Sequence, residues 1–274
     1  MPAKRKNTSL SHQVAQKRKG NNQGGGDVQP VNLEDAGTRG VTGGFVQPVN
    51  QEGAGTSGLS GVQAAIPLPS QNHQVRYPEI WIVGDSLVRG AHQQSLFGPE
   101  GPNLGLDSLG YRIIWEYISG MKISELRETI EYLLNFHAPP VMLIIHCGGN
   151  DLGLISTLEL TWSLKHFLQD YIKNALPNTK IVWSQILPRR TWRYIDDNLI
   201  AKRMCTRINS CLGKYFIKCG GAYIKYPDIT CESIYFSADD CHLSNLGYNV
   251  MVSTLSGAVY SFLFAGQAVF PYLS

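Results

Sequence analysis

The sequence predicts an α/β domain with a mostly parallel, five-stranded sheet and helices on both faces, preceded by a disordered segment. From residue 77 onward, short apolar runs alternate with stretches of helical periodicity, which is typical of such domains. Residues 1–75 are instead rich in Gly, Gln, Asn, Ser and Pro, with Phe45 as their only aromatic residue. The chain therefore divides into a leader, 1–75, and a domain, 76–274, which is long enough for one sizeable core.

The predicted elements follow one another as strand, loop, strand, helix, strand, helix, strand, helix, strand, helix. Apolar runs predict the strands at residues 79–83, 112–119, 141–145, 180–187 and 222–226. Apolar side chains three and four residues apart predict helices over 123–136, 156–175, 195–218 and 244–265. Residues 92–110, in the loop between the first two strands, carry no decisive pattern. Ligands bind such sheets at the carboxyl ends of the strands, so the functional residues are expected there.

The last predicted helix raises the question of a membrane span, because no charged residue follows Asp240. Ser253, Thr254, Ser256 and Ser261 interrupt the apolar residues of this segment. We therefore expect a helix that packs on the sheet and no membrane span.

Three side chains that can form a nucleophilic site follow the first and last strands. Ser86 comes directly after the first strand, where a tight turn would point its hydroxyl out of the sheet. Asp239 precedes His242 by three residues, so its carboxylate can accept a hydrogen bond from the Nδ1–H group and leave Nε2 free as a base. Each has an ordinary alternative: a helix cap for the serine, and a surface acid beside an incidental histidine.

Two further positions can supply hydrogen-bond donors at the same edge. Gly120 follows the second strand and can present an unobstructed backbone N–H. Asn150 follows the third strand and adds a side-chain amide. An ordinary turn before a helix would explain either residue alone. Together with Ser86, Asp239 and His242, they form a complete set of nucleophile, base, orienting acid and oxyanion donors.

These residues resemble the four sequence blocks of the SGNH (GDSL) hydrolase superfamily over residues 79–262. The blocks are Gly84-Asp-Ser-Leu87, Gly120, Gly148-Gly-Asn150-Asp151 and Asp239-x-x-His242. The resemblance implies a flavodoxin-like, three-layer α/β/α sandwich that hydrolyses esters, often acetyl or short-acyl esters, without a cofactor. It implies that Ser86 is the nucleophile, His242 the base and Asp239 its partner. Ser86, Gly120 and Asn150 would form the oxyanion hole.

Two other kinds of site fit the sequence less well. The α/β-hydrolase motif Gly-x-Ser-x-Gly requires a glycine where Val88 stands. The pairs His146-Cys147 and Cys241-His242 could hold a metal, but adjacent residues on a strand point to opposite faces and chelate poorly. We expect no metal.

The loop after the fourth strand mixes arginines with aromatic residues, a pattern that suits an anionic substrate or single-stranded nucleic acid. Arg189, Arg190 and Trp192 are therefore candidate substrate-binding residues. The alternative is a solvated loop in which the arginines pair with Asp196 and Asp197.

The leader carries the whole net charge of +3, because residues 76–274 contain 17 basic and 17 acidic residues. Its basic clusters at residues 4–6 and 17–19 resemble a bipartite nuclear import signal. Segments 28–40 and 46–58 match at ten of 13 positions, which indicates a duplicated linker. No secretory signal is visible and the six cysteines include no CxxC pair. We expect an intracellular protein, cytoplasmic or nuclear and not secreted.

Two functions follow from the sequence. The first is a serine esterase that cleaves a small-molecule, glycan or lipid ester through an acyl-enzyme. The second is a catalytically weak or inactive SGNH-fold interaction module whose basic leader contacts nucleic acid. A low-complexity leader ahead of a GDSL unit is also similar to proteins derived from vertebrate mobile elements. The sequence carries no signal of oligomeric state.

Overall fold

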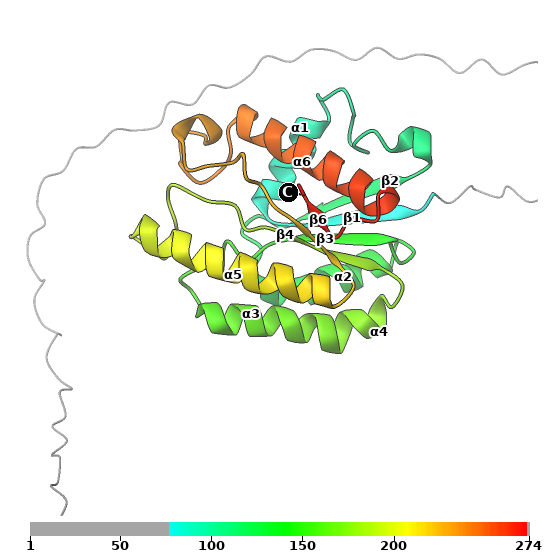
Figure 1. Cartoon of the computed structure of the whole chain (residues 1–274), viewed down its shortest axis with the longest axis horizontal. Helices are drawn as coiled ribbons and strands as arrows, with labels where there is room; N and C mark the ends of the chain where they lie inside the picture. The colour runs from blue at the N-terminus through cyan, green and yellow to red at the C-terminus, as the bar shows by residue number, and fades with distance from the viewer. Residues whose placement is uncertain (1–76, 273–274) are drawn as a thin grey trace, which may run out of the picture. The chain divides into compact units, whose positions relative to one another are not determined.

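A computed structural model describes residues 77–272 of the chain. They form a single parallel sheet between layers of helices (Figure 1). Its six strands follow the order β2-β1-β3-β4-β5-β6. The strands are β1 (Glu79–Gly84), β2 (Arg112–Tyr117), β3 (Met142–His146), β4 (Lys180–Ser184), β5 (Ala222–Ile224) and β6 (Val269–Phe270). The first five have the flavodoxin-like order, which reverses between β1 and β3. The basic clusters and the repeat of the leader lie outside the described residues, and the expectations placed on them stay predictions.

Helices cover both faces of the sheet, so the predicted three-layer sandwich is confirmed. Helices α1 (Ser86–Ser95) and α6 (Asn245–Phe264) cover one face. The other face carries α2 (Leu126–Leu134), α3 (Thr157–His166) and α5 (Asn198–Lys218). A π-helical segment, Phe167–Ile172, continues α3 into the short α4 (Lys173–Ala175).

The strands are apolar throughout because both of their faces are buried. In β1, Trp81 and Val83 point into the core beneath α2, α3 and α5, whereas Ile80 and Ile82 point toward α1 and α6. All four side chains are fully buried. Continuous apolar runs of this kind are typical of parallel strands between two helical layers.

The register of β1, β2 and β3 places the carboxyl ends of these strands at the same height in the sheet. The candidate residues follow these ends. Gly84 at the end of β1 pairs with Tyr117 on β2 and with His146 on β3. The segments that follow these three strands therefore begin side by side at the carboxyl edge.

The structure differs from the sequence-based expectation between the first two strands, where helix α1 replaces part of the expected loop. Only Leu87, Val88 and Ala91 supply buried apolar side chains, too few for a clear helical period. Gly90 disfavours a helix by itself. A Cβ at this position would lie 2.1 Å from the Tyr248 ring on α6, so the glycine lets the two helices approach closely.

The end of the domain also differs from the expected five strands, because β6 adds a two-residue sixth strand beside β5. Helix α6 packs on the sheet through Met251, Leu255 and Val259. Within residues 77–272, no helix is both long and apolar enough to cross a membrane.

Candidate active site

Ser86 is the first residue of α1, directly after β1 and the single residue Asp85. Asp85 has an extended backbone and caps the helix, since its Oδ1 accepts a hydrogen bond from the Leu87 N–H at 2.9 Å. The Ser86 N–H belongs to the first turn, whose N–H groups have no partner within the helix. The serine hydroxyl and its own N–H thus lie at the positive end of a helix dipole, which favours negative charge.

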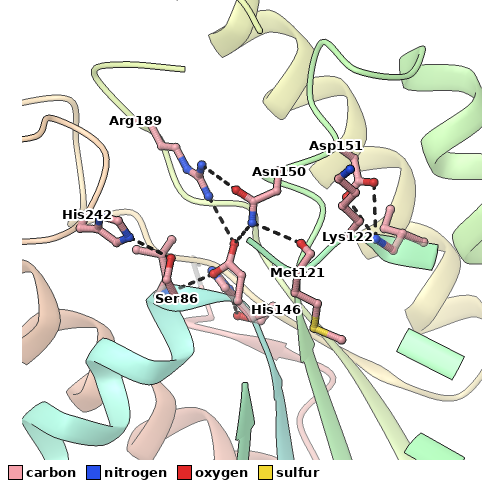
Figure 2. A network of polar contacts seen from close by, with 12 residues as sticks. Ser86, Met121, Lys122, His146, Asn150, Asp151, Arg189 and His242 are labelled. Carbon is pink, nitrogen blue, oxygen red and sulfur yellow. Dashed lines mark hydrogen bonds and ion pairs between the residues drawn. The ribbon is translucent and has the colours of Figure 1, made fainter. Parts of the chain in front are cut away.

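His242 and Asp239 form one hydrogen-bonded unit with Ser86. The His242 Nε2 lies 2.9 Å from the Ser86 Oγ (Figure 2). On the other side of the ring, Nδ1 lies 2.5 Å from the Asp239 Oδ2. The structure therefore places these three predicted residues in a continuous row, in the order that general-base activation of a serine requires.

A short loop holds the acid and the histidine together. The Asp239 Oδ1 accepts hydrogen bonds from the backbone N–H groups of Cys241 and His242, at 3.0 and 2.9 Å, and from the Ser237 hydroxyl at 2.7 Å. An antiparallel bridge between Phe236 and Leu243 closes the loop at its base. The hydrogen bond with His242 is the main reason why the pKa of Asp239 lies well below its usual range. The carboxylate is thus ionised at any ordinary pH.

The two predicted oxyanion donors belong to segments that Asn150 links to the residue before Ser86. The Asn150 Nδ2 is 3.0 Å from the Asp85 Oδ2 and 3.2 Å from the Met121 carbonyl oxygen (Figure 2). Met121 follows Gly120, which has a left-handed backbone, with φ +77°, and open space where a Cβ would project. Asn150 therefore bridges the segment that contains Gly120 and the segment that contains Ser86.

The arginine-rich loop after β4 is only partly solvated, because two of its residues, Arg189 and Trp192, are buried. Arg189 is only 7% exposed, and its guanidinium reaches Asp85 and Asn150. Arg190 pairs with Asp240 at 2.9 Å. The expected pairing with Asp196 and Asp197 is wrong, and Asp197 instead caps α5 through the Leu199 and Ile200 N–H groups.

Trp192 is also largely buried, and it packs in the core beneath the Arg189 guanidinium. Arg189 and Trp192 line a cavity of about 290 Å³ together with Pro188, Tyr226 and Ile229. Of the three candidate substrate-binding residues, only Arg190 has a substantially exposed side chain, at 37%.

Sequence reasoning missed two buried polar groups at this edge. Asp85 is 1% exposed and contacts both Asn150 and Arg189, although the sequence offered it no role. His146 is buried against the Ser184 hydroxyl at 2.9 Å, and Ser184 contacts the Tyr226 hydroxyl at 2.8 Å. Burial lowers the pKa of His146, which favours the neutral ring. The Gly-Asp dipeptide before Ser86 was the one available signal for Asp85.

The cysteine–histidine pairs do not converge on a metal. Among residues 77–272, no group of three His, Cys, Asp or Glu side chains could hold an ion. His146 faces Ser184, and His242 faces Ser86 and Asp239.

Comparison with known proteins identifies the fold. No protein-family model and no curated protein sequence matches the chain. Solved structures do match, and three of them align with about two thirds of this chain and with nearly all of their own length. A G-D-S-L family lipolytic protein from Veillonella parvula is 15% identical, with 69% of this chain and 99% of that chain covered and a TM-score of 0.51.

The other two are esterases. Est24, a carbohydrate acetylesterase from Sinorhizobium meliloti, is 16% identical, with 68% and 100% of the two chains covered and a TM-score of 0.51. EstA, a psychrotrophic esterase from a Pseudoalteromonas species, is 16% identical, with 68% and 98% covered and a TM-score of 0.52. The chain has the SGNH hydrolase fold. In this SGNH-fold domain, the row of Ser86, His242 and Asp239 stands at the carboxyl edge of the sheet, where ligands bind in such folds.

Proposed function

We propose that the chain is a serine esterase of the SGNH type, which hydrolyses an acetyl or short-acyl carboxylic ester through an acyl-enzyme. The observation that carries the proposal is the continuous hydrogen-bonded row from the Ser86 Oγ through the His242 ring to Asp239. A serine hydroxyl is a weak nucleophile unless a base within hydrogen-bond distance takes its proton. His242 is that base, and Asp239 holds the proton of the neutral ring on Nδ1.

The reaction proceeds in two stages. Ser86 attacks the acyl carbon while the His242 Nε2 takes the hydroxyl proton, and the same nitrogen then gives the proton to the leaving alcohol oxygen. A water molecule enters, loses a proton to Nε2, and attacks the acyl-enzyme, so that the carboxylic acid leaves and Ser86 regains its proton.

Both stages pass through a tetrahedral species with a negatively charged oxygen. The N–H groups of Ser86 and Gly120 and the Asn150 amide stabilise this oxygen. Both hydrogens of the Asn150 Nδ2 already have acceptors, Asp85 and the Met121 carbonyl. The oxyanion takes the place of the Met121 carbonyl, the longer of the two contacts.

The similar solved structures and the loop after β4 support the proposed substrate class. The similar solved structures include a carbohydrate acetylesterase and an esterase, which supports a glycan, lipid or other small-molecule ester. Arg190 is exposed beside the loop that carries His242, so it can contact an anionic part of the substrate.

The test uses the full chain with p-nitrophenyl acetate and a fluorophosphonate probe, comparing the wild type with Ser86→Ala. Ser124→Ala, which removes an exposed hydroxyl elsewhere, is the matched control. We expect covalent labelling at Ser86 and turnover in the wild type and the control, and neither in Ser86→Ala. Equal turnover in Ser86→Ala, or labelling at another residue, would overturn the proposal.

A further inference from the structure

A buried guanidinium lies behind the oxyanion donors. The Arg189 Nη1 donates to the Asn150 Oδ1 at 3.2 Å, and Nη2 lies 3.3 Å from the Asp85 Oδ2 (Figure 2). Arg189 and Asp85 are 7% and 1% exposed. One arginine thus contacts both the side chain that supplies the amide donor and the residue that precedes Ser86.

The contact with Asn150 helps to fix which end of the amide faces Ser86. The oxygen and nitrogen ends of an Asn side chain have nearly the same shape, so hydrogen-bond partners decide their orientation. Arg189 has only donors and therefore selects the oxygen end of Asn150. The Nδ2 end is then directed toward Asp85, the residue before Ser86, and toward the carbonyl oxygen of Met121, the residue after Gly120.

The contact with Arg189 places a positive charge beside the negative charge of the Asp85 carboxylate. Asp85 is a buried carboxylate next to the nucleophile, and negative charge there opposes the negative charge that develops on the substrate oxygen. The Arg189 guanidinium, held against this carboxylate, offsets its charge.

The surrounding residues adapt to the guanidinium. A Cβ on Gly149 would lie 2.7 Å from the Arg189 Nη2, so glycine at this position leaves room for it. The Arg189 Cζ lies over the Trp192 ring, 5.2 Å from the ring centre. The Arg189 Nε is buried and has no hydrogen-bond partner among the described residues. Burying a charged group with an unpaired donor is costly, and such costs are typical of functional sites.

We propose that Arg189 is a positioning residue of the oxyanion hole, which orients the Asn150 amide and offsets the Asp85 charge without touching the substrate. The inference rests on the proposed esterase function. It replaces the expectation that Arg189 binds substrate directly. It also predicts a distinct kinetic signature, because a residue that acts only on the transition state changes kcat and leaves KM nearly unchanged.

The test compares Arg189→Met and Arg189→Lys with Arg193→Met, a matched change at an exposed arginine of the same loop. With p-nitrophenyl acetate, we expect Arg189→Met to lower kcat by roughly 10- to 100-fold, below the full loss of an oxyanion donor. KM should stay within about threefold of the wild-type value. Arg189→Lys should lie between the two, because an ammonium keeps the charge but cannot span both partners. Arg193→Met should match the wild type.

Two further measurements separate positioning from a purely structural role. In Arg189→Ala, added guanidinium at millimolar concentration should restore part of kcat, whereas the same concentration of sodium chloride should not. Gly149→Ala keeps the guanidinium but crowds it, so it should lower kcat in the same way even if Arg189→Met does not fold.

The outcomes distinguish this inference from the proposed function. Folded Arg189→Met or Gly149→Ala with wild-type kcat would overturn the positioning role, as would a loss confined to KM. Loss of turnover in Ser86→Ala alongside such a result would leave the esterase proposal standing. Equal turnover in Ser86→Ala would overturn the esterase proposal and this inference with it.

Discussion

Replacing Asp239 with Asn tests how the histidine ring is held. In the wild type, the two carboxylate oxygens of Asp239 have different partners. Oδ1 accepts hydrogen bonds from two backbone N–H groups and a hydroxyl, and Oδ2 faces the His242 Nδ1. An Asn side chain has one acceptor, and the three donors around Oδ1 will hold it there. The amide NH₂ then faces Nδ1, which must become an acceptor, so the ring proton moves to Nε2. Such a ring cannot accept the Ser86 proton.

The expected loss of kcat in Asp239→Asn depends on how far the side chains of His242 and Asp239 are exposed to water. An Asp-to-Asn change in a buried Ser-His-Asp site lowers kcat by about 10⁴-fold. Here the side chains of His242 and Asp239 are 38% and 50% exposed, so water can partly replace the lost acceptor. We therefore expect a smaller loss in kcat of roughly 10²- to 10³-fold, or about 3–4 kcal/mol in activation free energy.

The assay is turnover of p-nitrophenyl acetate at saturating substrate, with the thermal midpoint as a check on folding. The midpoint should hardly change, because Asn keeps the contacts at Oδ1. Asp240→Asn is the matched control. Asp240 has a left-handed backbone that Asn tolerates, and its side chain forms only an exposed pair with Arg190. A loss of less than tenfold in a folded Asp239→Asn variant, or an equal loss in Asp240→Asn, would refute the tautomer argument.

Three further predictions concern neighbouring residues. Asn150→Ala removes one of three oxyanion donors, so kcat for p-nitrophenyl acetate should fall roughly 10²- to 10³-fold. The two backbone N–H groups should supply the residual activity, and full activity in this variant would exclude Asn150 from the oxyanion hole. Gly84→Ala would place a Cβ 2.2 Å from the His146 carbonyl oxygen, so the free energy of unfolding in urea should fall by about 1–3 kcal/mol or more, and an unchanged urea midpoint would contradict the close approach. Burial raises the pKa of Asp151 to about 6, above the value of about 3.9 in an unfolded chain. Between about pH 3.9 and about pH 6, the folded protein therefore binds a proton at Asp151 more tightly than the unfolded chain does. The free energy of unfolding falls as the pH rises through this range. Asp151→Asn should thus be more stable than the wild type by about 1 kcal/mol or more at pH 7.5, and the difference should vanish near pH 4. The same difference at both pH values in thermal melts would argue against a buried charge.

The strands and the site residues at their ends were accessible from the sequence because their signals are local. A strand buried on both faces is apolar along its whole length, and the residue after it falls at the sheet edge whatever the rest of the chain does. Helix α1 was not accessible in this way, since Gly90 is explained only by the Tyr248 ring on α6. Strand β6 is two residues long, too short to show a period of its own.

The role of Arg189 was out of reach for a related reason. Its partner Asp85 lies more than a hundred residues away in the chain, and nothing near either residue signals the pairing. The position of the loop directly after the fourth strand correctly indicated the carboxyl edge of the sheet, and the pattern of arginines and aromatic residues suggested contact with an anionic substrate. The prediction for the surroundings of Arg189 was wrong, because a run of basic residues suggests solvent exposure and Arg189 is buried.

The loop of residues 236–243 has a consequence for how such a site can change. Because hydrogen bonds within eight residues fix Asp239 and His242 to each other, base and acid form one unit. This unit is anchored to the loop after β4, since the Asp240 carbonyl oxygen accepts hydrogen bonds from the Arg190 and Thr191 N–H groups. Only one side-chain hydrogen bond of the row, between His242 and Ser86, joins distant parts of the chain. A shift of this loop as a whole would therefore change one distance of the site, the one between the His242 Nε2 and the Ser86 Oγ, and this distance reports whether the site is assembled.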